Sequence, residues 1–131
     1  MPRFGKRSLK NLSECHIDLQ RLLMEVIKHY DCSVIEGERG EEEQNVLFHA
    51  GKSKLVFPDS NHNKKPSLAV DVIPWPVDWN DKIQFYHFIG FVKGVATMRG
   101  IKIRCGADWD GDNSFIDQSF NDLPHIELIL D

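Results

Sequence analysis

Two histidines and one aspartate stand where their side chains could bind a metal ion together. His62 lies in a polar stretch, Asp71 follows nine residues later inside the apolar run 68–73, and His125 lies near the C-terminal end. Two imidazoles and a carboxylate are three of the ligands that a catalytic zinc accepts, and they leave its fourth position open for water. A carboxylate in an apolar strand is costly without a partner, and a bound cation would supply one. The sequence therefore predicts an open zinc site formed by these three residues.

Two carboxylates near His125 could serve as the general base of a hydrolysis. Asp122 lies three residues before His125, and Glu127 shares a strand face with His125 because side chains alternate along a strand. A carboxylate beside the metal would take a proton from the attacking water and pass it to the leaving amine. The sequence favours Asp122 as this base and leaves Glu127 as its competitor, with a supporting role near the metal for the other one.

Three further polar residues, Arg39, Gln44 and Ser60, could contact a substrate. A planar guanidinium binds a carboxylate through two parallel hydrogen bonds, so Arg39 could hold an acidic group of the substrate or brace the oxyanion of a tetrahedral intermediate. The alternative for Arg39 is an exposed ion pair with one of the glutamates at 41–43. Gln44 is expected on a helix surface or as support for Arg39, and Ser60 as a hydrogen-bonding partner of the substrate.

The acidic stretch after residue 106 carries a second metal hypothesis. Asp108, Asp110 and Asp112 place carboxylates at alternate positions around Gly111. Oxygen ligands in this arrangement resemble the start of a calcium loop. The alternative is a solvated acidic turn, so calcium is a second candidate cofactor beside zinc.

The hydrophobic pattern predicts the elements that must position these residues. Helices are expected over residues 13–30, 41–50 and 80–98. Strands are expected over residues 32–36, 68–73, 101–104 and 125–130. Loops at 52–67 and 106–122 carry His62 and Asp122. Short, proline-bounded strands favour an α+β fold, in which residues 1–131 form a small single domain with a mostly antiparallel sheet, about three flanking helices and a zinc cleft at the sheet edge.

Composition excludes several classes of protein. The chain of 131 residues is 41% hydrophobic and 27% charged, which is typical of one globular domain. Its formal charge of -4 argues against a protein that coats nucleic acid. No stretch approaches the roughly 18 apolar residues of a membrane span. The three cysteines form no C-x-x-C pair and so indicate neither a disulfide framework nor a thiolate zinc site. We expect a monomer without nucleic-acid partners or membrane insertion.

Four ordered blocks resemble the zinc peptidases that act on bacterial cell-wall peptides, a group of D-Ala-D-Ala carboxypeptidases and dipeptidases and of L-alanyl-D-glutamate endopeptidases used as phage endolysins. The family pattern has a Ser-x-His segment, an Ala-x-Asp strand, an acidic residue three positions before a final His, and an upstream Gly-x-Arg-x4-Gln. In this chain the blocks read Ser60-Asn61-His62, Ala69-Val70-Asp71, Asp122-Leu123-Pro124-His125, and Gly37-Glu38-Arg39 with Gln44. The resemblance covers most of the chain.

Two departures from the family pattern concern the predicted site. Eight residues separate His62 from Asp71, where many members have six, which two ligands on a loop and a strand can tolerate. Asp122 stands where many members have Glu, and it must lie closer to the metal because its side chain is one methylene shorter. Endolysin-type members share this Asp, which favours the endopeptidase branch.

The resemblance implies zinc-dependent hydrolysis of a peptide bond in peptidoglycan stem peptides by an L-alanyl-D-glutamate endopeptidase, acting as a phage or prophage endolysin. The alternatives are a D-Ala-D-Ala carboxypeptidase or dipeptidase, and a non-catalytic module that binds wall peptides. The basic start of the chain is not followed by the apolar stretch of a signal peptide. We therefore expect synthesis in the host cytoplasm and, as the family implies, action on the cell wall in the periplasm after release through a holin-made pore.

Overall fold

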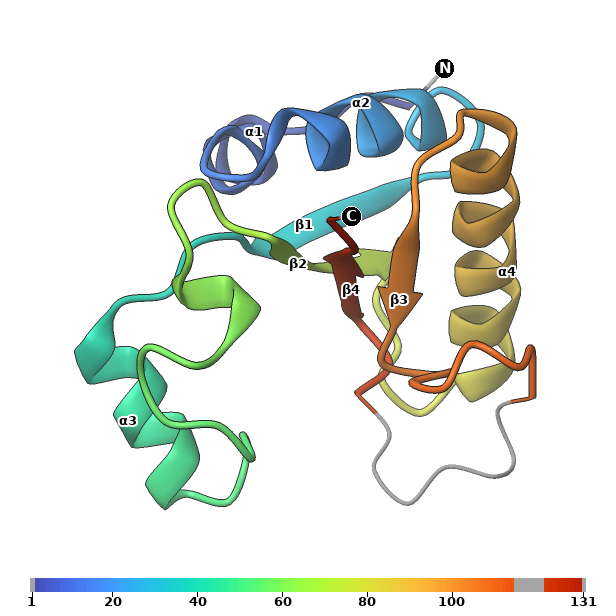
Figure 1. The fold of residues 1–131 in the computed structure, drawn as a ribbon. Coiled ribbons are helices and arrows are strands. Elements are labelled where there is room, and N and C mark those ends of the chain that lie inside the picture. The colour runs from blue at the N-terminus through green and yellow to red at the C-terminus, as the bar shows by residue number, and fades with distance from the viewer. Residues whose placement is uncertain (1, 115–121, 131) are drawn as a thin grey trace.

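A computed structural model of the chain describes residues 2–114 and 122–130, so residues 115–121 of the predicted acidic loop lie outside it (Figure 1). Over the described ranges the α-helices are α1 (Lys6–Ser13), α2 (Ile17–Val26), α3 (Glu41–His49) and α4 (Lys82–Met98). The strands are β1 (Cys32–Glu36), β2 (Ala69–Pro74), β3 (Ile103–Cys105) and β4 (His125–Leu128). The 3-10 turn η1 covers Asn61–Asn63.

The strands form one antiparallel sheet in the order β1-β2-β4-β3. This confirms the predicted α+β class, although the described residues form four helices where about three were expected. We expected the zinc cleft at the sheet edge, but β2 and β4, which carry two of the predicted ligands, are the inner strands. Asp71 and His125 lie directly opposite one another in this inner pair.

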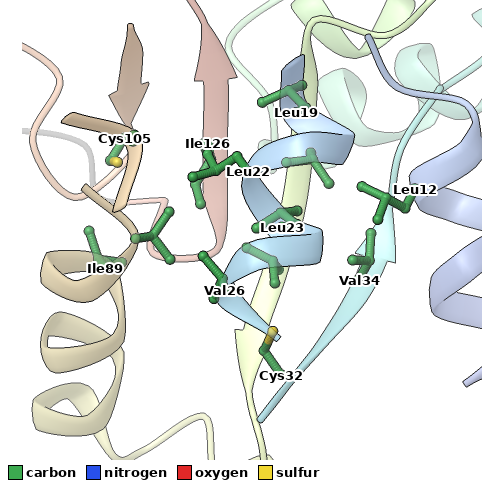
Figure 2. Close-up of a cluster of buried hydrophobic side chains, with 14 of the residues drawn as sticks. Leu12, Leu19, Leu22, Leu23, Val26, Cys32, Val34, Ile89, Cys105 and Ile126 are labelled. Carbon is green, nitrogen blue, oxygen red and sulfur yellow. The ribbon is translucent and has the colours of Figure 1, made fainter. Parts of the chain in front are cut away.

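The two faces of the inner strands carry different side chains, because successive residues of a strand point to opposite faces. Val70 and Val72 of β2 and Ile126 of β4 belong to the hydrophobic core. Figure 2 shows the core side chains of α2 gathered with those of β1, β4 and α4. Leu22 of α2 is fully buried there, as are its neighbours Leu19, Leu23 and Val26. Burying such a side chain stabilises the fold by about 1.5–3 kcal/mol. The opposite face is left for polar residues.

The N-terminal helical region differs from the prediction of one helix over residues 13–30. Within that range α2 covers only Ile17–Val26, and α1 (Lys6–Ser13) precedes it where no helix was expected. Residues 14–16 separate the two helices because they pair with the segment that precedes β2. The amide of Ser67 donates to the Glu14 carbonyl, and the amide of His16 donates to the Ser67 carbonyl, both at 2.9 Å. The ring Nδ1 of His16 then accepts from the amide of Asp18 at 3.1 Å and caps α2. A contact between distant segments thus moves the start of the predicted helix to Ile17.

Helix α4, the longest helix of the described chain, covers the same face of the sheet as α2 (Figure 1). The carboxylate of Asp81 caps it by accepting from the amide of Gln84 at 3.1 Å. Phe85, Phe88 and Val92 are buried along its inner side. Neither α4 nor any other helix in the described ranges has the length and apolarity needed to cross a membrane.

Candidate active site

The three predicted ligands come together on the polar face of the sheet. His62 belongs to η1, Asp71 to β2, and His125 is the first residue of β4. Nε2 of His62 lies 3.1 Å from Oδ1 of Asp71, and Nδ1 of His125 lies 3.5 Å from the same oxygen. All three side chains are buried, and one ligand atom from each lies within 4.8 Å of the others. These residues form a group that could hold one metal ion.

Hydrogen bonds behind the two rings determine which nitrogen faces Asp71. Nδ1 of His62 lies 2.8 Å from the carbonyl oxygen of Gly37, and Nε2 of His125 lies 2.8 Å from Oε1 of Glu127. Both oxygens can only accept, so each of these nitrogens carries a hydrogen and the neutral ring presents its lone pair to Asp71. Two lone pairs and a carboxylate oxygen in contact need a positive charge between them. A proton or a metal ion can supply it, and the donor set of two imidazoles and one carboxylate fits zinc.

The charge state of this group without a metal follows from its contacts. Burial would raise the pKa of Asp71, but its contacts with the His125 and His62 rings outweigh burial and hold that pKa well below its usual range. Burial would lower the pKa of His125, but its bonds to Asp71 and Glu127 raise that pKa to about 9. In the metal-free site these bonds favour the protonated form of His125. A metal ion that binds to this nitrogen must displace the proton.

A capping box fixes the turn that carries His62. The hydroxyl of Ser60 accepts from the amide of His62 at 3.2 Å, and the Ser60 amide donates to Oδ1 of Asn63 at 3.0 Å. Nδ2 of Asn63 donates to the carbonyl of Arg39 at 3.0 Å. Ser60, predicted to bind substrate, lines the cleft beside the three ligands and also holds His62 in place.

Arg39 is buried and tied to two side chains of the protein. Its Nε and Nη2 contact the two carboxylate oxygens of Glu36 at 3.1 and 2.6 Å, and its Nη1 donates to Oε1 of Gln44 at 2.8 Å. The partner of Arg39 is thus Glu36, not one of the glutamates at 41–43. Nη2 also lies 3.9 Å from Oδ2 of Asp71. A guanidinium has five N–H groups, so those outside these three bonds remain available at the cleft.

Asp122 lies beside the three ligands in a cleft of about 540 Å³. Its Oδ2 is 3.9 Å from Nδ1 of His125. Burial raises the pKa of Asp122, and the nearby Asp71 carboxylate raises it further, which makes Asp122 a stronger proton acceptor. Its backbone amide donates to the carbonyl of Gly106 at 3.1 Å. A Cβ at position 106 would lie 2.0 Å from the Asp122 carbonyl oxygen, so only glycine permits this approach.

Glu127, the competing base, uses both carboxylate oxygens on other side chains. Oε1 accepts from His125, and Oε2 accepts from Nε and Nη2 of Arg104 at 3.1 and 2.5 Å. Burial would raise the pKa of Glu127, but these bonds lower it. A carboxylate with a low pKa and both oxygens bonded is a poor proton acceptor. The geometry thus favours Asp122 as the base, whereas Glu127 orients the ring of His125.

Comparisons with known proteins identify the family of the chain. A sequence model of the family "Phage L-alanyl-D-glutamate peptidase" matches residues 1–129. The chain belongs to this family. It is 28% identical to the L-alanyl-D-glutamate peptidase of Escherichia phage T5, over 97% of this chain and 98% of that protein. The crystal structure of the L-Ala D-Glu endopeptidase ChiX of Serratia marcescens matches with a TM-score of 0.76 and 27% identity, over 97% of this chain and 90% of that chain. The predicted family and the predicted peptidase class are confirmed.

The acidic stretch after residue 106 brings the carboxylates of its three aspartates together, but a lysine of α4 also contacts this stretch. Ligand oxygens of Asp108, Asp110 and Asp112 lie within 4.8 Å of one another. Nζ of Lys93 in α4 lies 2.8 Å from Oδ2 of Asp108 and 2.7 Å from Oδ1 of Asn113. The ammonium group of Lys93 already neutralises part of the negative charge that would attract a calcium ion to these carboxylates. Calcium binding stays a prediction from the sequence.

The sequence argument missed the contacts of three residues around the family motif, Glu36, Gly37 and Arg104. Glu36 binds Arg39, Gly37 orients His62 through its carbonyl, and Arg104 binds Glu127. The ring of Trp109 lies 5.2 Å from the ring of His125 and lines the cleft. Gly37 stood inside the Gly-x-Arg motif and could have been noted. Arg104 faces Glu127 only because β3 and β4 pair in this register, which no local pattern reveals.

The contact between Glu127 and His125 leads to a first prediction. Glu127→Ala is expected to lower zinc affinity by about 10–100-fold, because His125 loses the acceptor that orients its ring and increases its basicity. Glu127→Gln, which keeps an acceptor oxygen without the charge, should lose less. Competition with a colorimetric chelator measures both affinities. Equal zinc affinity in wild type and Glu127→Ala would contradict this role.

Proposed function

We propose that the protein is a zinc-dependent L-alanyl-D-glutamate endopeptidase that cleaves the stem peptide of peptidoglycan and acts as a phage or prophage endolysin. One observation carries the zinc dependence: two ring nitrogens and one carboxylate oxygen converge in a buried group, and one of its members, His125, lines a cleft. Family membership supports the bond that is cleaved. Action on the wall after release from the host cytoplasm is part of the same proposal.

The zinc ion would be held by Nε2 of His62, Oδ1 of Asp71 and Nδ1 of His125. When bound, zinc supplies a Lewis acid that polarises the scissile carbonyl and lowers the pKa of water. Gly37 and Glu127 keep the two rings turned so that their lone pairs face this position. Asp71 supplies the negative charge of the ligand set.

Asp122 performs the proton transfers in this proposal. Its carboxylate takes a proton from the water that attacks the scissile carbonyl and delivers that proton to the leaving amine of the glutamate. The raised pKa of Asp122 suits both steps, because the group must bind the proton and then release it. The remaining N–H groups of Arg39 can donate to the oxyanion that forms at the carbonyl. Glu36 and Gln44 hold the guanidinium still while this charge develops.

Digestion of purified peptidoglycan tests the proposed function. We expect the zinc-loaded protein to create new L-alanine C-termini and new D-glutamate N-termini. A chelator should abolish both, and added zinc should restore them. Release of D-alanine without cleavage of the L-alanyl-D-glutamate bond would support the carboxypeptidase alternative instead. Zinc binding without any new terminus would support a non-catalytic wall-binding module.

A further inference from the structure

Glu127 is a buried carboxylate whose two oxygens have different partners. Oε1 accepts from Nε2 of His125 at 2.8 Å, and Oε2 accepts from Nε and Nη2 of Arg104 at 3.1 and 2.5 Å. The side chain of Glu127 is 8% exposed, so water contributes little to solvating its charge. The position of the oxygen that faces His125 therefore depends on what holds the other oxygen.

The pairing of Arg104 with Glu127 differs from the other arginine–glutamate pair beside the site. Arg39 directs Nε and Nη2 to the two oxygens of Glu36, one nitrogen to each oxygen. This is the two-bond match that a guanidinium and a carboxylate usually form, and it engages both oxygens. Arg104 directs the same two nitrogens to a single oxygen of Glu127. This second arrangement leaves Oε1 for the ring of His125.

Strand pairing and a tryptophan place the side chain of Arg104. Arg104 of β3 lies directly opposite Glu127 of β4, and Figure 1 shows these two strands side by side. Residues opposite one another in an antiparallel pair have their side chains on the same face of the sheet. The guanidinium carbon of Arg104 lies 5.9 Å from the centre of the Trp109 ring, and that ring lies 5.2 Å from the ring of His125. Arg104 is thus close to both side chains that flank His125 on this side.

We propose that Arg104 is a positioning residue of the metal site: it fixes the carboxylate of Glu127, which in turn holds Nδ1 of His125 toward the metal position. This inference rests on the proposed function, since that function places zinc at Nδ1 of His125. Without Arg104, the buried carboxylate of Glu127 loses its cation and turns toward water. His125 then loses the acceptor that fixes its tautomer and its orientation. Arg104 thereby contributes to zinc binding without touching zinc.

The positive charge of Arg104 has an opposite effect on a cation nearby. If Arg104 acted on zinc through its charge alone, its removal would relieve a repulsion and raise the zinc affinity. The side chain of Arg104 is 48% exposed, so water screens this repulsion. A positioning role predicts the reverse, a lower zinc affinity after removal. The sign of the change therefore separates the two roles.

The test compares the zinc affinities of the wild type, Arg104→Met and Arg104→Lys by competition with a colorimetric chelator. Methionine keeps much of the aliphatic stem and removes the guanidinium, whereas lysine keeps a charged donor for Oε2 of Glu127. Arg99→Met is the matched control, because Arg99 also pairs with a glutamate, Glu25, and neither of them lines the cleft. Thermal unfolding of each metal-free protein is compared first.

We expect Arg104→Met to lower the zinc affinity about fivefold, less than Glu127→Ala, because the carboxylate itself remains. Arg104→Lys should stay within about twofold of the wild type, since its ammonium group can still donate to Glu127. Arg99→Met should leave the affinity unchanged.

A double variant tests whether Arg104 acts through Glu127. In a Glu127→Ala background, Arg104→Met should cause no further loss of zinc affinity, because the carboxylate that it holds is gone. The full loss in this background would overturn the proposal. An unchanged or higher zinc affinity in the single variant Arg104→Met would overturn it as well.

Failure of the proposed function gives a different result. If the wild type binds no zinc, the zinc-dependent reaction fails, and the positioning role is then measured on the metal-free protein. The hydrogen on Nε2 of His125 exchanges slowly with water while Glu127 accepts it, and nitrogen-resolved NMR follows this exchange. Exchange about tenfold faster in Arg104→Met, and unchanged in Arg99→Met, supports the role of Arg104. Equal exchange rates in the wild type and Arg104→Met overturn it.

Discussion

Asp122→Asn is expected to lower kcat by about 10²–10⁴-fold, the usual contribution of a positioned general base, with zinc still bound. The asparagine has nearly the same shape but cannot take a proton from water. Asp122 lies 3.9 Å from His125 and is not needed to complete the group of three ligands. The loss should therefore appear in kcat, with little change in KM or in zinc content.

Steady-state kinetics on a soluble stem peptide, together with metal analysis of the same protein, measures this effect. Asp59→Asn is the matched control, because it removes an exposed carboxylate from the same cleft. Asp122→Glu should recover part of the activity, since it restores a carboxylate on a longer side chain. Full activity in Asp122→Asn with zinc retained would show that another group, Glu127 before any other, is the base.

Asp71→Asn is expected to remove zinc at micromolar metal concentrations and to lower activity by about 10³-fold or more, because the several kcal/mol that a bound metal contributes are lost. Asp71 is the anionic member of the ligand set, and its Oδ1 is the atom that both rings approach. An amide oxygen has the same size but carries no full charge. It also cannot neutralise a cation between the two histidines.

Metal content after gel filtration and activity across a zinc titration measure the result. In the presence of a chelator, Asp71→Asn should also be less stable than wild type, because the metal-free variant loses the ion pair of Asp71 with the protonated His125. Asp59→Asn again serves as control and should retain zinc. A variant that binds zinc with wild-type affinity would remove Asp71 from the proposed ligand set.

Local patterns were sufficient for most elements and for the site motif. The prediction of a helix over 41–50 and of a strand over 32–36 agrees with α3 and β1, because both depend on propensity and short-range spacing. Helix α1 was not predicted, and the start of α2 at Ile17 was missed because it depends on Ser67, which lies about 50 residues further along the chain. The partner of Arg39 was also missed, since a bulge at the end of β1 determines where Glu36 lies.

The sequence by itself determined the two faces of the inner strands. Alternation places Val70 and Val72 on one side of β2 and Asp71 on the other, and it separates Ile126 from His125 in the same way, because the period of a strand is two. The family blocks then indicated which polar residues would meet.

Only the tertiary structure distinguishes the surroundings of Asp122 from those of Glu127. Both carboxylates lie close to His125 in the sequence, so local spacing cannot separate them. The register of β3 against β4 brings Arg104 next to Glu127. Arg104 and His125 together then occupy both oxygens of the Glu127 carboxylate. The close approach at Gly106 brings Asp122 to the cleft with a raised pKa. Chemistry at this site depends on which partners each carboxylate meets, and strand pairing determines those partners.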